Sequence, residues 1–144
     1  MECTIRWSDG VQFVAETGSG HAFVIDGAPE VGGRNTGPRP METVLAGAGA
    51  CTASDVVVIL KRSGQDVTGC RVDLKAERAA TDPKVFTAIH MHFVVRGRSL
   101  KRSLVENAIK LSHTKYCSAS AMLGKTAAMT HDYELIDEPA TPPR

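Results

Sequence analysis

The stretch from Pro40 to Arg62 constrains the fold more than any other part of the chain. Proline is well tolerated in the first turn of a helix, where its missing N–H would have no partner anyway. Small residues fill the middle of the stretch and large aliphatic residues flank it, leaving four charged side chains: Glu42, Asp55, Lys61 and Arg62. A helix that is apolar on almost every side must be buried. We therefore predict a long, buried central helix.

Two glycines inside this predicted helix indicate close packing. Each costs roughly 1 kcal/mol relative to alanine, which is tolerable where another backbone packs tightly against Gly47 and Gly49. The face that carries Gly47 also carries, at helical spacing, Cys51, Ser54 and Val58. Cys51 is then either a small apolar residue that fills a tight helix crossing or a redox-active thiol.

The composition is that of a soluble globular protein. The 144 residues are 42% hydrophobic and 23% charged, which suits one domain with its own core. Seventeen basic and sixteen acidic residues leave a net charge of +1, so no nucleic-acid surface is indicated. No apolar leader follows Met1, and polar residues interrupt the central stretch too often for a membrane span. We expect a cytoplasmic protein without nucleic-acid, membrane or cofactor partners.

The four cysteines, Cys3, Cys51, Cys70 and Cys117, lie far apart in the sequence. No CxxC pair predicts a zinc site, and a chain without a secretion signal does not predict a disulfide framework. In a reducing compartment each of these cysteines is either buried filler or redox-active.

Alternating apolar and polar residues predict three antiparallel strands within residues 3–26, the first of them with one buried face. The segment 27–40 is a loop by its glycine and proline content, and it carries Arg34 and Arg39. These arginines are either solvated surface charges or, for one of them, a cation that folds over the start of the central helix and stabilises a thiolate there.

Further strands and helices are predicted after the central helix. The predicted elements are a hairpin of strands at 68–78 and 89–96, a helix at 100–112 capped by Ser99, a short helix at 118–125 and a strand at 129–136. The chain is therefore expected to be an α+β protein, with a single domain over 1–136 and a flexible C-terminal tail over 137–144.

His90 and His92 lie on one face of the second strand of the predicted hairpin. An HxH pair can bind a metal ion, but no third ligand is evident nearby. Exposed polar positions on an amphipathic strand explain both histidines equally well, so no metal site is assigned.

Cys117 stands at the start of the predicted short helix. Backbone amides and the helix dipole favour an anion there, so the local sequence favours Cys117 as the more reactive thiol. If the two helices cross, Cys51 and Cys117 come within bonding range. Such a pair suits peroxide reduction, in which one thiolate attacks the O–O bond to give a sulfenic acid and the other thiol condenses with it to a disulfide. Arg34 or Arg39, with Glu42, is available to hold the thiolate charged.

Two motifs carry a resemblance to a known family. They are GPRPMETVLAGAGACTASDVV at Gly37–Val57 and KYCSASAML at Lys115–Leu123. Together with the order of the elements between them, they resemble the OsmC/Ohr family of thiol peroxidases, and most of all its YhfA-like branch. The resemblance extends over nearly the whole chain, from Glu2 to Ile136.

The resemblance implies an OsmC-like fold and an intertwined homodimer in which curved sheets surround two long central helices. It implies reduction of organic hydroperoxides, with Cys51 as the peroxidatic cysteine and Cys117 as the resolving cysteine. It also implies that a dithiol reductant of the lipoyl type recharges the site.

The chain differs from the family's pattern at two positions. The family's catalytic glutamate matches Met41, one place before Glu42, and neighbouring residues on a helix point about 100° apart. The family's arginine matches either Arg34 or Arg39, of which we favour Arg39.

Two functions follow, and the first is favoured. It is a thiol-dependent hydroperoxide reductase for oxidative-stress defence, with a site made of Cys51, Cys117, Arg39 and Glu42. The alternative is a non-catalytic, stress-related protein of the same fold that holds a small apolar ligand in its dimer cleft. A metal-dependent enzyme built on the HxH pair is a third possibility.

Overall fold

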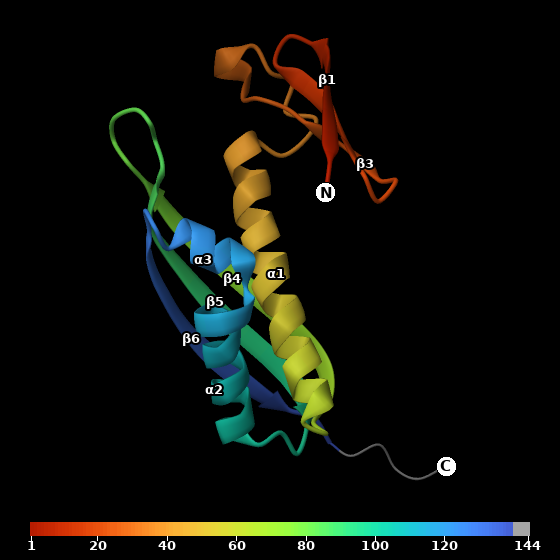
Figure 1. Cartoon of the computed structure of the whole chain (residues 1–144), viewed down its shortest axis with the longest axis vertical. Helices are drawn as coiled ribbons and strands as arrows, with labels where there is room; N and C mark the ends of the chain where they lie inside the picture. Colours follow the sequence, from red (N-terminus) through yellow and green to blue (C-terminus); the bar gives the residue numbers. More distant parts are fainter. Residues whose placement is uncertain (140–144) are drawn as a thin grey trace. The chain divides into compact units, whose positions relative to one another are not determined.

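The computed structural model describes residues 1–139 (Figure 1). These residues fall into two units, Met1–Ala46 and the part that begins at Gly47, each with its own three-stranded sheet. Two sheets combined with a long helix confirm the predicted α+β class.

The first unit is the predicted antiparallel meander. Its strands are β1 (Cys3–Asp9), β2 (Gln12–Thr17) and β3 (Ala22–Ile25), in the order β1-β2-β3. Gly10 makes the first turn with a φ of 53°, and a Cβ there would lie 2.8 Å from the carbonyl oxygen of Gly32. Both facts favour glycine at this turn.

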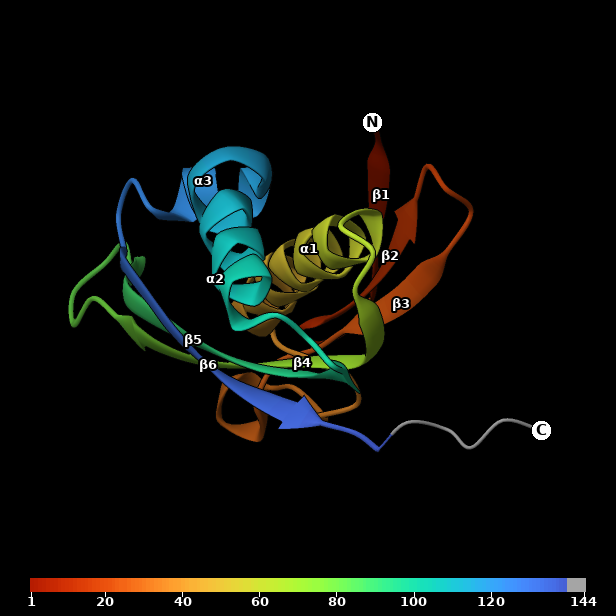
Figure 2. The same cartoon turned by 90° about the horizontal axis from the view of Figure 1, so that it is seen from below.

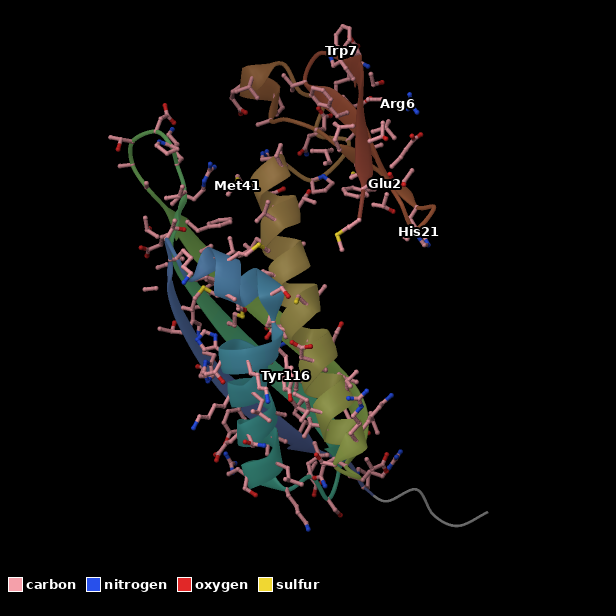
Figure 3. The ribbon with its side chains drawn as sticks, viewed as in Figure 1. Glu2, Arg6, Trp7, His21, Met41 and Tyr116 are labelled. Carbon is pink, nitrogen blue, oxygen red and sulfur yellow. The ribbon has the colours of Figure 1, made fainter. Side chains whose placement is uncertain are left out.

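The first strand departs from its predicted burial. All seven residues of β1 are exposed in the described chain, including Trp7 at 67%. The indole N–H of Trp7, labelled in Figure 3, donates to the carbonyl of Gly10 at 3.0 Å. The prediction of a buried face was wrong for the single chain, because alternation marks a face that can be covered and not the layer that covers it.

The loop after β3 is organised by one buried carboxylate. It contains a single 3-10 turn, η1 (Pro29–Val31). Asp26 is 1% exposed, and its two oxygens accept hydrogen bonds from the backbone N–H groups of Gly27, Arg34 and Thr36 and from the Thr36 hydroxyl, at 2.8 to 3.1 Å. These bonds, those from Thr36 foremost, lower the pKa of Asp26 to about 2.

The sheet of the second unit combines an antiparallel hairpin with a parallel strand. β4 (Asp66–Arg78) and β5 (Phe86–Arg98) form the predicted hairpin, and β6 (Ala128–Asp137) pairs with β5 in parallel. A parallel neighbour needs a crossover connection. Helix α2 (Arg102–Leu111), the π-helical turn η2 (Ser112–Tyr116) and helix α3 (Ser118–Leu123) provide it. Figure 2 shows these helices on one face of the sheet.

The core of the second unit lies between that face and the helices. Its buried apolar side chains include Ile89, Phe93 and Val95 from β5, Val105, Ala108 and Ile109 from α2, and Val56 and Leu60 from the long helix α1 (Pro40–Arg62). Helix α1 is the predicted central helix, and it begins and ends at the predicted residues, Pro40 and Arg62.

The burial of α1 differs from the prediction. Only a stripe of it is buried, made of Ala48, Gly49, Thr52, Val56 and Leu60, whereas Val58 is 44% exposed. A Cβ at Gly49 would lie 2.7 Å from Cδ1 of Leu74 on β4, so the predicted close packing occurs there. Within the described chain Gly47 has no such neighbour. One sheet covers only one side of a helix, and the prediction of burial on nearly every side was wrong for the single chain.

Three smaller features complete the second unit. Ser99 does not cap α2: it has a φ of 52°, and Lys101 occupies the N-cap position without a side-chain bond. The predicted break before α3 is the π-helical turn. β6 ends at Asp137, the first residue of the predicted tail, and the tail residues 140–144 lie outside the described residues.

By length and composition alone, α1 is apolar enough to cross a membrane. Core helices of soluble proteins pass the same criterion. Gly49 and Leu60 belong to the stripe that is buried within the protein, which is the arrangement of a core helix.

Candidate functional site

Cys51 lies on α1 beside the buried stripe and is partly buried. One helical turn later comes Asp55, also partly buried, so both side chains leave α1 on the same side. The next residue after Cys51, Thr52, is 1% exposed and anchors this turn of the helix in the core.

Cys117 is the N-cap residue of α3 and is 2% exposed. Its Sγ accepts hydrogen bonds from the backbone N–H of Ser120 at 3.4 Å and from the Ser120 hydroxyl at 3.2 Å. Its own N–H donates to the carbonyl of Ser112 at 2.9 Å, which closes the π-helical turn. The thiol is therefore held by the two elements on either side of it.

The two cysteines meet although 66 positions separate them in the sequence. The sulfur atoms of Cys51 and Cys117 and a carboxylate oxygen of Asp55 all lie within 4.8 Å of one another. Both thiols are free. The structure thus brings together the two predicted site cysteines, while the role of each one stays a prediction.

The surroundings of Cys51 do not favour its thiolate within this chain. Burial raises the pKa of the Cys51 thiol, while a hydrogen bond from the backbone N–H of Ala119 lowers it. The pKa of Cys51 is raised further by a hydrogen bond and the charge of Cys117, and by the charge of Asp55. A thiolate at Cys51 would need a cation from elsewhere.

Asp55 is held by a buried pair of hydroxyl groups. The Ser112 hydroxyl donates to Oδ2 of Asp55 at 3.0 Å and lies 2.8 Å from the Thr52 hydroxyl. Because Ser112 has a single hydroxyl proton, the Thr52 hydroxyl donates to Ser112 when Ser112 donates to Asp55. The sequence prediction missed all three residues as parts of the site. The available signal was a carboxylate four positions after a cysteine in an otherwise apolar helix.

Arg39 and Glu42 lie in the first unit and contact each other. The backbone N–H of Arg39 donates to Oε2 of Glu42 at 2.9 Å, and its guanidinium donates to Oε1 at 3.4 Å. Arg34 instead forms an ion pair with Asp9. Met41, at the position of the family's glutamate and labelled in Figure 3, is partly buried. Of the two candidate arginines, Arg39 is the one paired with the predicted carboxylate.

Asp132 lies beside both histidines of the HxH pair. Nδ1 of His92 lies 2.6 Å from Oδ1 of Asp132 on β6, and Nε2 of His90 lies 3.3 Å from the same oxygen. The parallel register, which places His92 opposite Asp132, creates this contact. All three side chains are at least 36% exposed, and the hydrogen bond from His92 lowers the pKa of Asp132.

The other two cysteines, Cys3 and Cys70, are not members of the cluster of Cys51, Asp55 and Cys117. Cys3 is exposed on β1, and Cys70 is partly buried on β4, where burial raises its pKa. Both serve as internal controls in the experiments below.

Known proteins match this chain in sequence and in fold. A family model described as OsmC-like protein matches residues 33–132. The chain is 44% identical over 139 residues to protein YhfA of Escherichia coli strain K12. The alignment covers 94% of this chain and 98% of YhfA. The chain therefore belongs to the OsmC-like family, which confirms the resemblance.

Solved structures show the same fold. A hypothetical protein from Aquifex aeolicus VF5 is 29% identical with a TM-score of 0.84, covering 96% of this chain and 97% of that one. The organic hydroperoxide resistance protein OhrB of Bacillus subtilis is 17% identical with a TM-score of 0.62, covering 93% and 98%. The second likeness is one of fold alone.

Proposed function

We propose that this protein is a thiol-dependent peroxidase that reduces organic hydroperoxides to alcohols in oxidative-stress defence. The observation that carries the proposal is the approach of the Cys51 and Cys117 sulfur atoms, which lie within 4.8 Å of each other. Two comparisons support the proposal. The chain belongs to the OsmC-like family, and it shares its fold with a protein called an organic hydroperoxide resistance protein.

The proposed reaction has three steps. The Cys51 thiolate attacks the O–O bond of ROOH, forms an S–O bond and releases RO⁻, which takes a proton to become ROH. The Cys117 thiol then attacks the sulfur of the Cys51 sulfenic acid, forms a disulfide and releases water. A dithiol reductant, proposed to be of the lipoyl type, returns the disulfide to two thiols and becomes a disulfide itself.

Arg39 and Glu42 are proposed to serve the same reaction. Since burial and Asp55 raise the pKa of Cys51, a cation is needed to hold its thiolate, and a carboxylate orients that cation. Arg39 already pairs with Glu42. The assignment rests on the family resemblance, and replacement of Arg39 by glutamine should slow peroxide reduction while Arg34→Gln should not.

A cytoplasmic homodimer is part of the proposal. Val58 of α1 and Tyr116 of η2 are 44% and 49% exposed in the single chain, which leaves apolar surface for a second copy to cover. A dimeric mass in light scattering is the expected result.

One equivalent of cumene hydroperoxide added to the reduced protein tests the mechanism. We expect a Cys51–Cys117 disulfide in peptide mass maps, with Cys3 and Cys70 still free. Cys51→Ser should reduce turnover to the uncatalysed rate, and Cys117→Ser should leave a sulfenic acid that dimedone traps. The control Cys70→Ser should behave as the wild type. Slow, scattered oxidation of all four thiols would exclude a peroxidase.

The alternative is a non-catalytic protein of the same fold that binds a small apolar ligand in its dimer cleft. Two observations favour it: the raised pKa of Cys51 and the presence of Met41 where the family has an acid. A ligand that copurifies in native mass spectrometry, together with no peroxide turnover, would support this function instead.

A further inference from the structure

The site brings together three side chains that can bind a metal ion, and no sequence motif predicts this grouping. Cys51 and Asp55 are separated by one helical turn of α1, and Cys117 comes from the start of α3. Their ligand atoms, two sulfurs and one carboxylate oxygen, all lie within 4.8 Å of one another. Asp55 is the unexplained member, because its negative charge disfavours a thiolate nucleophile beside it.

The spacing of the three atoms suits a tetrahedral ion. Zinc binds thiolate sulfur at about 2.3 Å and carboxylate oxygen at about 2.0–2.2 Å, so ligand atoms around one tetrahedral ion lie roughly 3.6–3.8 Å apart. To reach these separations, the side chains would have to approach one another by at most about 1 Å from the 4.8 Å limit. The fourth position would hold water.

Outer contacts already orient two of the three ligands. The Ser112 hydroxyl donates to Asp55, and Ser120 donates twice to the sulfur of Cys117. Partners of this kind fix the ligands of metal sites and tune their affinity. They also lower the cost of assembling the site, because the ligands are placed before the ion arrives.

A pocket borders the site at Asp55. A pocket of about 290 Å³ is lined by Asp55 and Arg62 together with apolar side chains that include Leu111 and Tyr116. Tyr116 is labelled in Figure 3, at the end of the π-helical turn. Of the three proposed ligands, Asp55 lines this pocket and Cys117 is buried.

We propose that the reduced protein binds one zinc ion per chain through Sγ of Cys51, Sγ of Cys117 and a carboxylate oxygen of Asp55. Two thiolates select zinc over magnesium or calcium, which prefer oxygen ligands. The bound ion occupies both thiols and so protects them from oxidation. The proposal stands on this geometry alone and does not require the protein to be a peroxidase.

Metal titration of the reduced, chelator-treated protein tests the proposal. Zinc is titrated against a chromogenic chelator, and cobalt(II) is used as a spectroscopic substitute. We expect one ion per chain and a thiolate-to-cobalt charge-transfer band. The near-isosteric Asp55→Asn variant should weaken zinc binding at least about tenfold, and Ser112→Ala should weaken it about tenfold. Cys51→Ser and Cys117→Ser should each weaken the band.

Two controls separate this site from the others. Cys70→Ser removes a partly buried thiol outside the site, and His92→Ala removes a member of the exposed cluster with His90 and Asp132. Both variants should bind zinc as the wild type does. A loss of the stoichiometric zinc in His92→Ala would place the ion at the histidines and overturn the proposal.

A chemical readout guards against variants that do not fold. Zinc should protect Cys51 of the wild type from iodoacetamide, while the exposed Cys3 of the same molecules is alkylated at an unchanged rate. Protection should be lost in Asp55→Asn, whose fold is checked by circular dichroism. Absence of the cobalt–thiolate band in the wild type, or wild-type zinc affinity in Asp55→Asn, would refute the three-ligand site.

Discussion

Asp26 in the first unit is buried and Asp55 in the second is partly buried, and the two carboxylates have different hydrogen-bond partners. Asp26 accepts four hydrogen bonds, three of them from backbone N–H groups and one from the Thr36 hydroxyl. Among the described residues Asp55 accepts one, from Ser112, and faces two thiols. A saturated carboxylate holds a loop in place, whereas one with unused acceptor positions is available for chemistry.

Substitution by asparagine should separate the two roles most clearly. In Asp26→Asn the new amide N–H₂ group faces backbone donors of Arg34 and Thr36, so we expect the thermal midpoint to fall by roughly 5–10 °C. Asp55→Asn should change it by less than about 2 °C. Melting curves at neutral pH measure both, and equal losses in the two variants would break the comparison.

Acid should remove the contribution of Asp26. Its pKa lies at about 2 in the folded protein against an ordinary value of 3.8, so its stabilisation is fully present above about pH 4. That stabilisation is lost as the pH falls through about 2. The difference in midpoint between the wild type and Asp26→Asn should therefore shrink between pH 4 and pH 2. A constant difference across that range would show that the charge of Asp26 does not stabilise the loop.

The hydroxyl groups of Thr52 and Ser112 next to Asp55 should show a coupled effect. Ser112→Ala leaves the hydroxyl of Thr52, which is 1% exposed, without its acceptor, at a cost of about 1–3 kcal/mol in the free energy of unfolding. The double variant Thr52→Val with Ser112→Ala should cost less than the sum of the single changes, because neither hydroxyl then remains unpaired. Additive losses in urea unfolding would argue against a bonded pair.

The smallest effect is expected at an exposed carboxylate. Asp132 is 61% exposed and pairs with His90 and His92. Exposed ion pairs contribute little, so Asp132→Asn should shift the thermal midpoint by less than about 2 °C. A shift as large as that of Asp26→Asn would show that the number of hydrogen bonds does not rank these carboxylates.

Periodicity predicted most of the fold. The bounds of α1 and the strands of both sheets followed from Pro40 and from alternation along the chain. Burial was harder to predict: Val58 and Trp7 carry apolar patterns but are exposed in the single chain. Apolar patterning marks a face that can be covered, and it does not say which layer covers it.

The site was predictable in its cysteines and not in its carboxylate. A helix start and a small-residue helix marked Cys117 and Cys51 as candidates. Asp55 became part of the site only through the crossing of α1 with the turn at Ser112, a contact between residues 57 positions apart. Asp132 likewise joined the histidines through a parallel register that local sequence does not encode.

That parallel register also has a consequence for synthesis of the chain. β5 ends at Arg98 and its parallel neighbour β6 begins at Ala128, so two helices must leave the ribosome before the sheet is complete. Until then the more apolar strand of the hairpin presents an unpaired edge, which is a template for association with other chains. A nascent or truncated chain that stops before β6 therefore exposes an open sheet edge on β5 to other chains.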